Sequence, residues 1–265
     1  MKLARMPYIN VDPFYYTLEH GAREPDIELV TGFPRQIGRL ADDNESIDVG
    51  PISVMDYLSV QNTYEPLGGL CVAVREKAGS VNLFSRLPVR ELSNHTIGIT
   101  SQTSTSRVLM RLILEQRYGV KSAIYLDQPG QDAVDAYLFI GNNALVYAHN
   151  GLKGFNFMYD LGEEWYQWTG LPFVFARWAV RKAVLGSSKD RLAALLGQSL
   201  DSFWQHEPEM AQTRGAELHL STGAVQDYWH LFIYRQTAEV DRSLALFSDA
   251  LKEIKGVFFN GQEKK

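Results

Sequence analysis

The chain has 265 residues, of which 45% are hydrophobic and 22% charged, so it can form one large globular domain or two small ones. Its formal net charge is −5 and it has no strongly basic block, which argues against nucleic-acid binding by bulk electrostatics. Cys71 is the single cysteine, and this excludes an internal disulfide and a cysteine-based zinc site.

Targeting signals and cofactor motifs are missing from the sequence. The first residues, MKLARMPYIN, lack the apolar core and the cleavage site of a signal peptide, and no apolar run reaches the length of a membrane span. The six histidines do not have metal-site spacing, and no P-loop, G-x-G-x-x-G or G-x-S-x-G motif occurs. We therefore expect a cytoplasmic protein without a membrane partner, a metal ion or an organic cofactor.

Short β-type runs alternate with helix-compatible segments through residue 140. Strands are predicted at residues 2–8, 26–31, 47–50, 70–75, 81–85, 96–100, 123–126 and 136–140, and helices at residues 34–43, 53–59 and 107–117. This alternation is typical of an α/β protein with a parallel or mixed sheet and helices on its faces. Two α/β lobes tied by crossover strands fit the pattern, and so does a single sheet.

Helical patterns dominate after residue 179. They cover residues 182–206, 207–218 and 237–255, and no strand candidate of comparable quality remains among them. The aromatic-rich segment just before them, residues 159–180, is interpreted mainly as core packing, and its last ten residues alternate weakly, as a crossover strand would. An acidic group in this segment is interpreted as charge at a helix N-terminus rather than as a catalytic pair; it consists of Asp160, Glu163 and Glu164.

The strongest local feature is TSQTSTSRVLM at residues 100–110. Six of its first seven residues carry hydroxyl groups, and an apolar helical pattern follows. The first N–H groups of a helix lack intrahelical partners and lie at the positive end of the helix dipole, so hydroxyls beside them favour binding of a carboxylate or phosphate. A helix cap needs only one or two of the hydroxyls; a capping cluster at a solvated turn is the alternative interpretation.

Three further corners of the chain have a strand followed by a helix start. Asn10 follows the first strand, in YINVDPF, and ligands of open α/β sheets gather at the carboxyl ends of strands. Its alternative role, or that of Asp12, is to cap the following helix, with Pro13 in the first turn. Ser53 ends DVGPIS, where a simple strand-to-helix turn is the alternative. Gly141, in LFIGNNAL, would let the backbone approach a ligand.

Taken together, these segments resemble the chorismate dehydratases of the futalosine route to menaquinone. The matching pieces occur in the family's order over most of residues 7–181: YINVDPF, GFPRQIGRLADDNESIDVGPISVMDYL, SVNLFSR, TSQTSTSRVLMRLILEQRYGV, IGNNAL and DLGEEWYQWTGLPFVFARWAV. The resemblance implies a type II periplasmic-binding-protein-like fold, two-lobed with a central cleft and a helical C-terminal part. We expect residues 1–86 plus 177–265 to form lobe 1 and residues 87–176 to form lobe 2.

The resemblance also implies the site. Asn10 matches the Asn of the family's Y-x-N-x-x-P motif and is the expected catalytic residue. The expected substrate-binding residues are Ser53, Ser85, Thr103, Ser104, Thr105, Ser106, Gly141 and Asn142. Because side chains on one helical turn cannot all point the same way, one or two of the four consecutive hydroxyl residues are expected to serve only as a cap. The chain departs from the family at Asn142, where the usual motif is Gly-Asp-x-Ala-Leu.

The implied activity is a hydro-lyase reaction that converts chorismate, a small dicarboxylate, to 3-[(1-carboxyvinyl)oxy]benzoate and water. Two other functions are open: a cytoplasmic small-carboxylate-binding protein or inactive homologue, and an enzyme like 1,4-dihydroxy-6-naphthoate synthase. The latter's early Ser-Pro-Cys-Pro-Asn-Asp motif is missing from YINVDPF. The sequence leaves the oligomeric state open.

Overall fold

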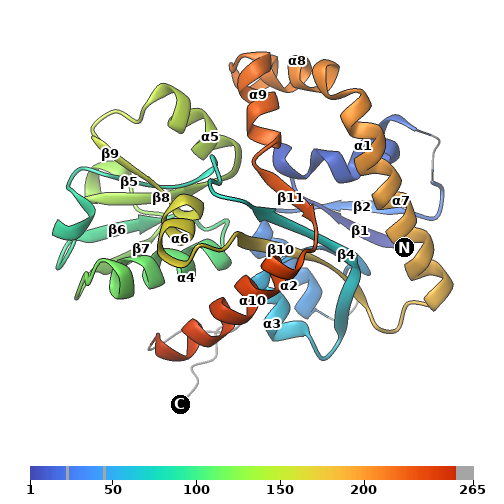
Figure 1. Ribbon diagram of the computed structural model, residues 1–265, viewed down its shortest axis with the longest axis horizontal. Helices are drawn as coiled ribbons and strands as arrows, with labels where there is room; N and C mark the ends of the chain where they lie inside the picture. Colours follow the sequence, from blue (N-terminus) through green and yellow to red (C-terminus); the bar gives the residue numbers. More distant parts are fainter. Residues whose placement is uncertain (22–23, 44–45, 255–265) are drawn as a thin grey trace. The chain divides into compact units, whose positions relative to one another are not determined.

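The computed structural model describes residues 1–21, 24–43 and 46–254 (Figure 1). The chain divides into two compact units. Unit 1 comprises Met1–Ala73 and Val174–Gln236, and unit 2 comprises Val74–Phe173 and the residues from Thr237 onward. The chain therefore passes from one unit to the other three times. No helix in the described ranges has both the length and the apolar character needed to cross a bilayer.

A six-stranded sheet in the order β11-β4-β10-β3-β1-β2 forms the centre of unit 1. Its strands are β1 (Lys2–Arg5), β2 (Glu28–Thr31), β3 (Val49–Ser53), β4 (Tyr64–Val74), β10 (Phe173–Arg181) and β11 (Phe232–Arg235). β1 is parallel to both β2 and β3, whereas β10 is antiparallel to β3. The buried runs of β1 and β3 supply apolar residues to the core on this sheet.

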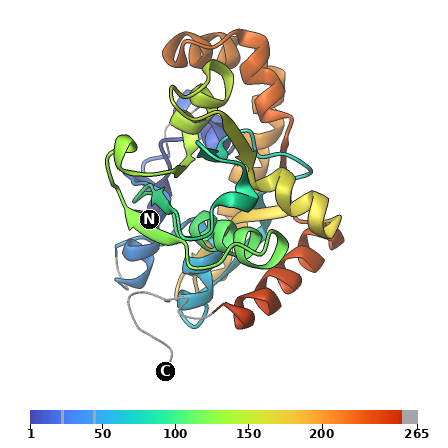
Figure 2. The same cartoon turned by 90° about the vertical axis from the view of Figure 1, so that its left-hand side faces the viewer.

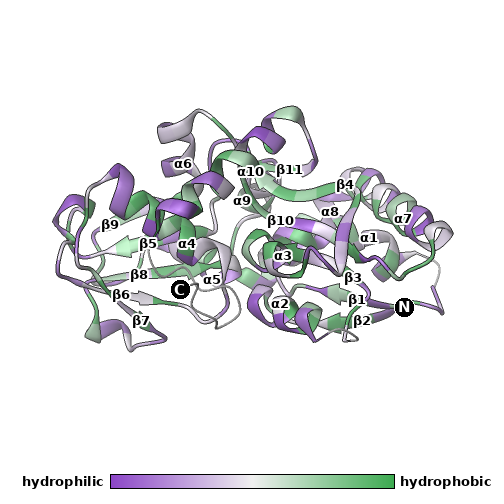
Figure 3. Cartoon of the chain, turned by 90° about the horizontal axis from the view of Figure 1, so that it is seen from below, coloured by the Kyte–Doolittle hydropathy of each residue, from purple (hydrophilic) through white to green (hydrophobic). Residues whose placement is uncertain are grey.

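The described residues of unit 1 form seven helical segments. They are η1 (Ile9–Val11), α1 (Asp12–His20), α2 (Pro34–Asp42), α3 (Val54–Val60), α7 (Gly186–Gln205), α8 (Glu207–Leu218) and α9 (Thr222–Trp229). α7 alternates hydrophilic and hydrophobic residues in Figure 3, and its buried side, including Leu196, packs against α1. Below α1 the ring of Trp178 lies 5.0 Å from that of Phe14 and 5.7 Å from that of Tyr15, between ring centroids, so aromatic packing fixes α1 on the sheet.

Unit 2 has a five-stranded sheet in the order β7-β6-β8-β5-β9. The strands are β5 (Val81–Ser85), β6 (Thr96–Ile99), β7 (Ile124–Asp127), β8 (Ala136–Ile140) and β9 (Phe157–Asp160). β6 is parallel to β7 and β8, and β5 is antiparallel to β8 and β9. The carboxyl end of β8 therefore lies beside the amino end of β5.

The main helices of unit 2 are α4 (Thr105–Leu112), α5 (Gly141–Asn150), α6 (Leu161–Thr169) and α10 (Ala238–Ala250). The π-helical turn η3 (Ile113–Arg117) continues α4. The described residues of this unit also form three short 3-10 turns, η2 (Val89–Glu91), η4 (Gln131–Ala133) and η5 (Leu251–Glu253). α6, yellow in Figure 1, runs beside α4 in Figures 1 and 2, and Arg117 pairs with Glu164 at 3.0 Å. Trp165 packs against Phe173 and Phe247 and donates a hydrogen bond from Nε1 to Ser243 Oγ at 3.1 Å.

This division differs from the boundaries expected from the sequence. β5 pairs with β8 and β9, so residues 74–86 belong to unit 2 rather than to the first lobe. α10 also belongs to unit 2, because Phe247 packs on Trp165. The helix predicted at residues 237–255 ends as α10 at Ala250, and its last residue lies outside the described ranges.

Strand β11 corrects the expectation that no further strand follows residue 179. Its four residues, FIYR, give too short a pattern to compete with the helices on either side. The strand nevertheless completes the sheet, and Gln236 N donates to Gly69 O at 2.7 Å just beyond it. The pairing is set by tertiary contacts, which override weak local propensity.

Candidate active site

Two neighbouring strands of unit 2 end at the same edge of the sheet, and a helix begins after each. β6 and β8 are parallel, with Ile99 opposite Leu138. α4 begins at Thr105 and α5 at Gly141. Both helices present N–H groups and the positive end of a dipole at this edge, which suits an anion. We call this place the hydroxyl edge and define it by residues 103–106, 141 and 142.

The four hydroxyl residues before and within the first turn of α4 have different roles. Thr103 is buried, and its Oγ1 accepts a hydrogen bond from Ser106 N at 3.1 Å, so Thr103 caps the helix. Thr105 is buried as well. Ser104 is half-buried and Ser106 is buried, and in the part of the chain that the structure describes neither hydroxyl has a hydrogen-bond partner. These two hydroxyls are the donors available to a ligand.

The backbone conformation at position 141 requires glycine, the residue without a side chain. Its φ of 67° lies in the left-handed region, which disfavours residues with a Cβ, and its N–H donates to Ser80 O at 2.8 Å. The bend starts α5 directly after the last residue of β8. Asn142 follows as a half-buried residue in the first turn of the helix. The N-terminus of α5 is thereby held at the hydroxyl edge.

In unit 1 the corresponding edge holds Asn10 and Ser53, because β1 and β3 are also parallel neighbours. Ser53 is the N-cap of α3: its Oγ accepts from Asp56 N at 3.3 Å and donates to Asp56 Oδ2 at 2.6 Å. The hydroxyl proton of Ser53 is thus committed to a carboxylate of the protein. These bonds fit the alternative interpretation of this corner as a simple strand-to-helix turn.

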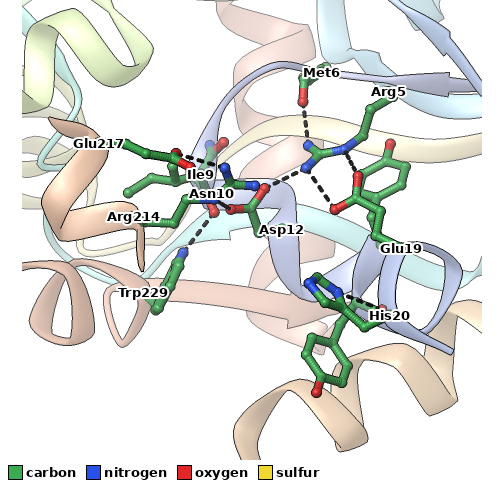
Figure 4. Close-up of polar contacts among 12 residues, drawn as sticks. Arg5, Met6, Ile9, Asn10, Asp12, Glu19, His20, Arg214, Glu217 and Trp229 are labelled. Carbon is green, nitrogen blue, oxygen red and sulfur yellow. Dashed lines mark hydrogen bonds and ion pairs between the residues drawn. The ribbon is translucent and has the colours of Figure 1, made fainter. Parts of the chain in front are cut away.

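Asn10 lies in the short turn η1 and is held through the backbone. Trp229 Nε1 donates to Ile9 O at 2.7 Å (Figure 4). Tyr234 OH donates to Asn10 O at 3.0 Å. The Asn10 side chain is different, since its Oδ1 atom is buried and no described residue provides it with a hydrogen-bond partner. An unpaired buried amide oxygen costs about 1–3 kcal/mol, so its presence calls for an explanation.

Neither Asn10 nor Asp12 caps α1. The N-cap residue is Val11, within the described residues no side chain caps this turn, and Pro13 occupies the first turn as expected. Asp12 instead forms ion pairs with Arg5 (Nη2 to Oδ1, 2.6 Å) and Arg214 (Nε to Oδ2, 2.7 Å). Burial raises the pKa of Asp12, and the two arginines oppose that rise.

Comparison with known proteins identifies the family. A family model described as menaquinone biosynthesis matches residues 1–253. The chain belongs to this menaquinone-biosynthesis family. Chorismate dehydratase of Thermus thermophilus is 28% identical over 268 residues, which cover 92% of each sequence.

Solved structures show the fold. The protein AF1704 of Archaeoglobus fulgidus superposes with a TM-score of 0.76 at 19% identity, covering 95% of this chain and 96% of that one. The periplasmic aliphatic sulphonate binding protein SsuA of Escherichia coli gives 0.63 at 14%, covering 96% and 86%. The expected periplasmic-binding-protein-like fold is therefore confirmed for this member of the menaquinone-biosynthesis family.

Ser85 does not lie at the hydroxyl edge of this menaquinone-biosynthesis protein. It pairs with Ala136, the first residue of β8, whereas Val81 pairs with Ile140, the last. Four residues of strand separate the two positions, about 13 Å at 3.3 Å per residue. The Ser85 hydroxyl donates to Leu87 O at 2.7 Å and accepts from Leu87 N at 3.2 Å, so it closes a local turn.

Asn82 is a polar residue near the hydroxyl edge that no sequence motif singles out. It is fully buried on β5; its Nδ2 donates to Gly79 O at 3.1 Å and to Ala144 O at 3.5 Å, which ties the first turn of α5 to the start of β5. Its Oδ1 is buried without a partner among the described residues. An amide inside the apolar run SVNLFSR was the available signal, since buried strands of this kind are otherwise apolar.

The acidic group at the start of α6 has the structural role expected of it. Asp160 is the N-cap of α6, and its Oδ1 accepts from Gly162 N at 2.9 Å and from Glu163 N at 3.1 Å. The same carboxylate accepts from Ala78 N and Gly79 N in the segment before β5. Asp160 thus joins two loops of unit 2 through four backbone donors.

Proposed function

We propose that the protein is a chorismate dehydratase, a hydro-lyase that forms 3-[(1-carboxyvinyl)oxy]benzoate and water from chorismate in the cytoplasm, on the futalosine route to menaquinone. Membership of the menaquinone-biosynthesis family and the similarity to a chorismate dehydratase support the reaction class. The observation that carries the proposal is the hydroxyl edge, where two helix N-termini meet the unpaired hydroxyls of Ser104 and Ser106. This is a donor-rich, positively polarised place, as a substrate carboxylate requires.

Dehydration of chorismate depends more on stabilising the charge that develops on the ring carboxylate than on a strong base, because the loss of water makes the ring aromatic. In the proposed reaction a ring C–H proton leaves first, and the ring carboxylate held at the hydroxyl edge accepts the developing negative charge. The C–O bond to the ring hydroxyl then breaks, and hydroxide combines with a proton to give water. Fixed donors around the carboxylate stabilise the carbanion without reorganising.

Asn10 supplies an acceptor that fits the one donor of the substrate. At neutral pH both carboxylates of chorismate are ionised and only accept hydrogen bonds, so the ring hydroxyl is its O–H donor. The unpaired Oδ1 of Asn10 is a matching acceptor, and its Nδ2 can donate to the side-chain carboxylate or to the departing oxygen. A neutral amide cannot remove the ring proton, and we propose that the substrate's own side-chain carboxylate receives it.

The test is to incubate the purified protein with chorismate, follow the loss of diene absorbance and identify the product by mass spectrometry. Formation of the enolpyruvyl benzoate with water as co-product is the expected result. Binding measured by calorimetry without turnover would instead indicate a carboxylate-binding protein or inactive homologue. Absence of both would overturn the proposal and leave a dihydroxynaphthoate-forming reaction as the next candidate within menaquinone biosynthesis.

A further inference from the structure

The carboxylate of Asp12 lies in unit 1 within a chain of charged residues (Figure 4). Arg5 on β1 donates to Asp12 Oδ1, and Arg214 on α8 donates to Oδ2. Arg5 also donates to Glu19 at 2.8 Å, and Arg214 donates to Glu217 at 2.8 Å. The side chain of Asp12 is only 2% exposed, so the two arginines compensate a charge that could not otherwise be buried.

This network holds the turn that carries Asn10. Asp12 is two residues beyond Asn10, and the carbonyl oxygens at Ile9 and Asn10 accept hydrogen bonds from Trp229 and Tyr234. The backbone is therefore fixed on both sides of the Asn10 side chain, by groups from four other elements: β1, α8, α9 and β11. The side-chain amide is the part of the turn left for a ligand.

We propose that Arg214 is a positioning residue, which fixes the Asn10 amide for catalysis through its ion pair with Asp12. The inference rests on the proposed function. It assigns a contribution to catalysis to a residue of α8, a helix for which the sequence resemblance implies no role. Arg5 is a poorer candidate for a test, because it also donates to Met6 O and to Glu19 and so supports β1 and α1 directly.

Loss of Arg214 should affect the chemical step more than substrate binding. Arg214→Gln removes one of the two cations on Asp12 and loosens the turn, and displacement of a reacting group by about 1 Å can lower a rate about 100-fold. We expect kcat for chorismate to fall about 10-fold or more with KM changed less than about 3-fold, since the hydroxyl edge belongs to unit 2. Arg214→Lys keeps the charge but not the forked donor, and should recover part of kcat.

The pH profile provides a second readout that loss of packing would not change. The groups that face Asp12 or its cations are Arg5 on β1, Arg214 on α8, Tyr15 and Glu19 on α1, Tyr234 on β11, and Glu217 on α8. A cation beside a carboxylate favours its ionised form. Without Arg214 the pKa of Asp12 rises further, so the acidic limb of the kcat profile should move to higher pH.

A matched control is Arg191→Gln, which removes an arginine of the same unit whose partners are Glu24 and, at 3.9 Å, Asp26. It should leave kcat, KM and the pH profile unchanged. Thermal unfolding of each variant checks that it is folded, and the Lys variant carries the test if the Gln variant does not fold. Wild-type enzyme without turnover would overturn the proposed function itself. Wild-type turnover with an unchanged kcat and acidic limb in the Arg214 variants would overturn this inference alone.

Discussion

Asn10 and Ser53 show that polar residues at equivalent strand-to-helix corners can differ in what they leave unpaired. Ser53 gives its proton to Asp56 and accepts from the Asp56 N–H, so its hydrogen-bonding capacity is used within the protein. The Oδ1 of Asn10 is buried and unpaired among the described residues. An unpaired buried polar atom is a cost that a functional site can offset when substrate binds.

Replacement of Asn10 by Asp tests this difference. Asn10→Asp nearly keeps the shape but places a negative charge where the proposed dianionic substrate would bind, and at neutral pH it replaces the amide donor by a second acceptor. We expect kcat/KM for chorismate to fall at least about 100-fold, which corresponds to roughly 2.7 kcal/mol of lost transition-state stabilisation. Steady-state kinetics at neutral pH measures it. Undiminished turnover would remove Asn10 from the mechanism.

Two serines of unit 2 have different expected roles, one in ligand binding and the other in local structure. Ser106 has a hydroxyl without a described partner at the start of α4, whereas Ser85 closes a turn with Leu87 at the other end of the sheet. Ser106→Ala should weaken chorismate binding about 10-fold or more, since a hydrogen bond to a charged group contributes about 1.5–3 kcal/mol. Ser85→Ala is the matched control and should lower stability without changing the affinity. Equal affinities for both variants in calorimetry would contradict the assignment of the hydroxyl edge.

At the level of elements, α5 begins with a glycine of positive φ and is followed by another. Gly141 has φ 67° at the hydroxyl edge, and Gly151 has φ 77° at the C-cap, where an added Cβ would meet no atom within 4 Å. Alanine at either position should cost about 1–2 kcal/mol, because L-residues disfavour this conformation.

The two alanine variants should therefore differ in binding and not in stability. Gly141→Ala moves the N-terminus of α5 and is expected to raise KM for chorismate several-fold, whereas Gly151→Ala acts at the opposite end of the helix and should leave KM unchanged. Urea unfolding compares the two stabilities, and initial rates compare the two KM values. A higher KM for Gly151→Ala than for Gly141→Ala would exclude the start of α5 from the binding site.

For the whole molecule, the sequence predicts most strands of both sheets because their apolar runs are bounded by turn residues. It also predicts the hydroxyl edge, since a strand, a run of hydroxyls and a helical pattern follow one another at residues 96–117. It does not predict that β5 joins the second sheet, because strand pairing depends on contacts distant in the sequence. That pairing places Ser85 away from the edge and brings Asn82 near it.

The partners of Asn10 could not be predicted for the same reason. Trp229 lies 220 positions from Ile9, the residue before Asn10, and Arg214 lies 202 positions from Asp12, and neither lies in a segment with a recognisable motif. A sequence pattern over ten or twenty residues describes the turn that carries Asn10 but not the helices that contact this turn. Positioning residues of this kind become visible only when the chain is folded.

Ligand binding at the level of the whole molecule should appear as added stability. The proposed product, 3-[(1-carboxyvinyl)oxy]benzoate, keeps both carboxylates of chorismate and would not be consumed, so it can be present at equilibrium during unfolding. A ligand that binds only the native state at 100 times its Kd stabilises it by about 2.7 kcal/mol, and the melting temperature should rise with product concentration. Benzoate, with one carboxylate, is the matched control and should give a smaller rise at equal concentration, because it lacks the second charged group. Equal shifts with the two compounds would mean that the protein binds a single carboxylate, and recognition of chorismate as a dicarboxylate would then have to be abandoned.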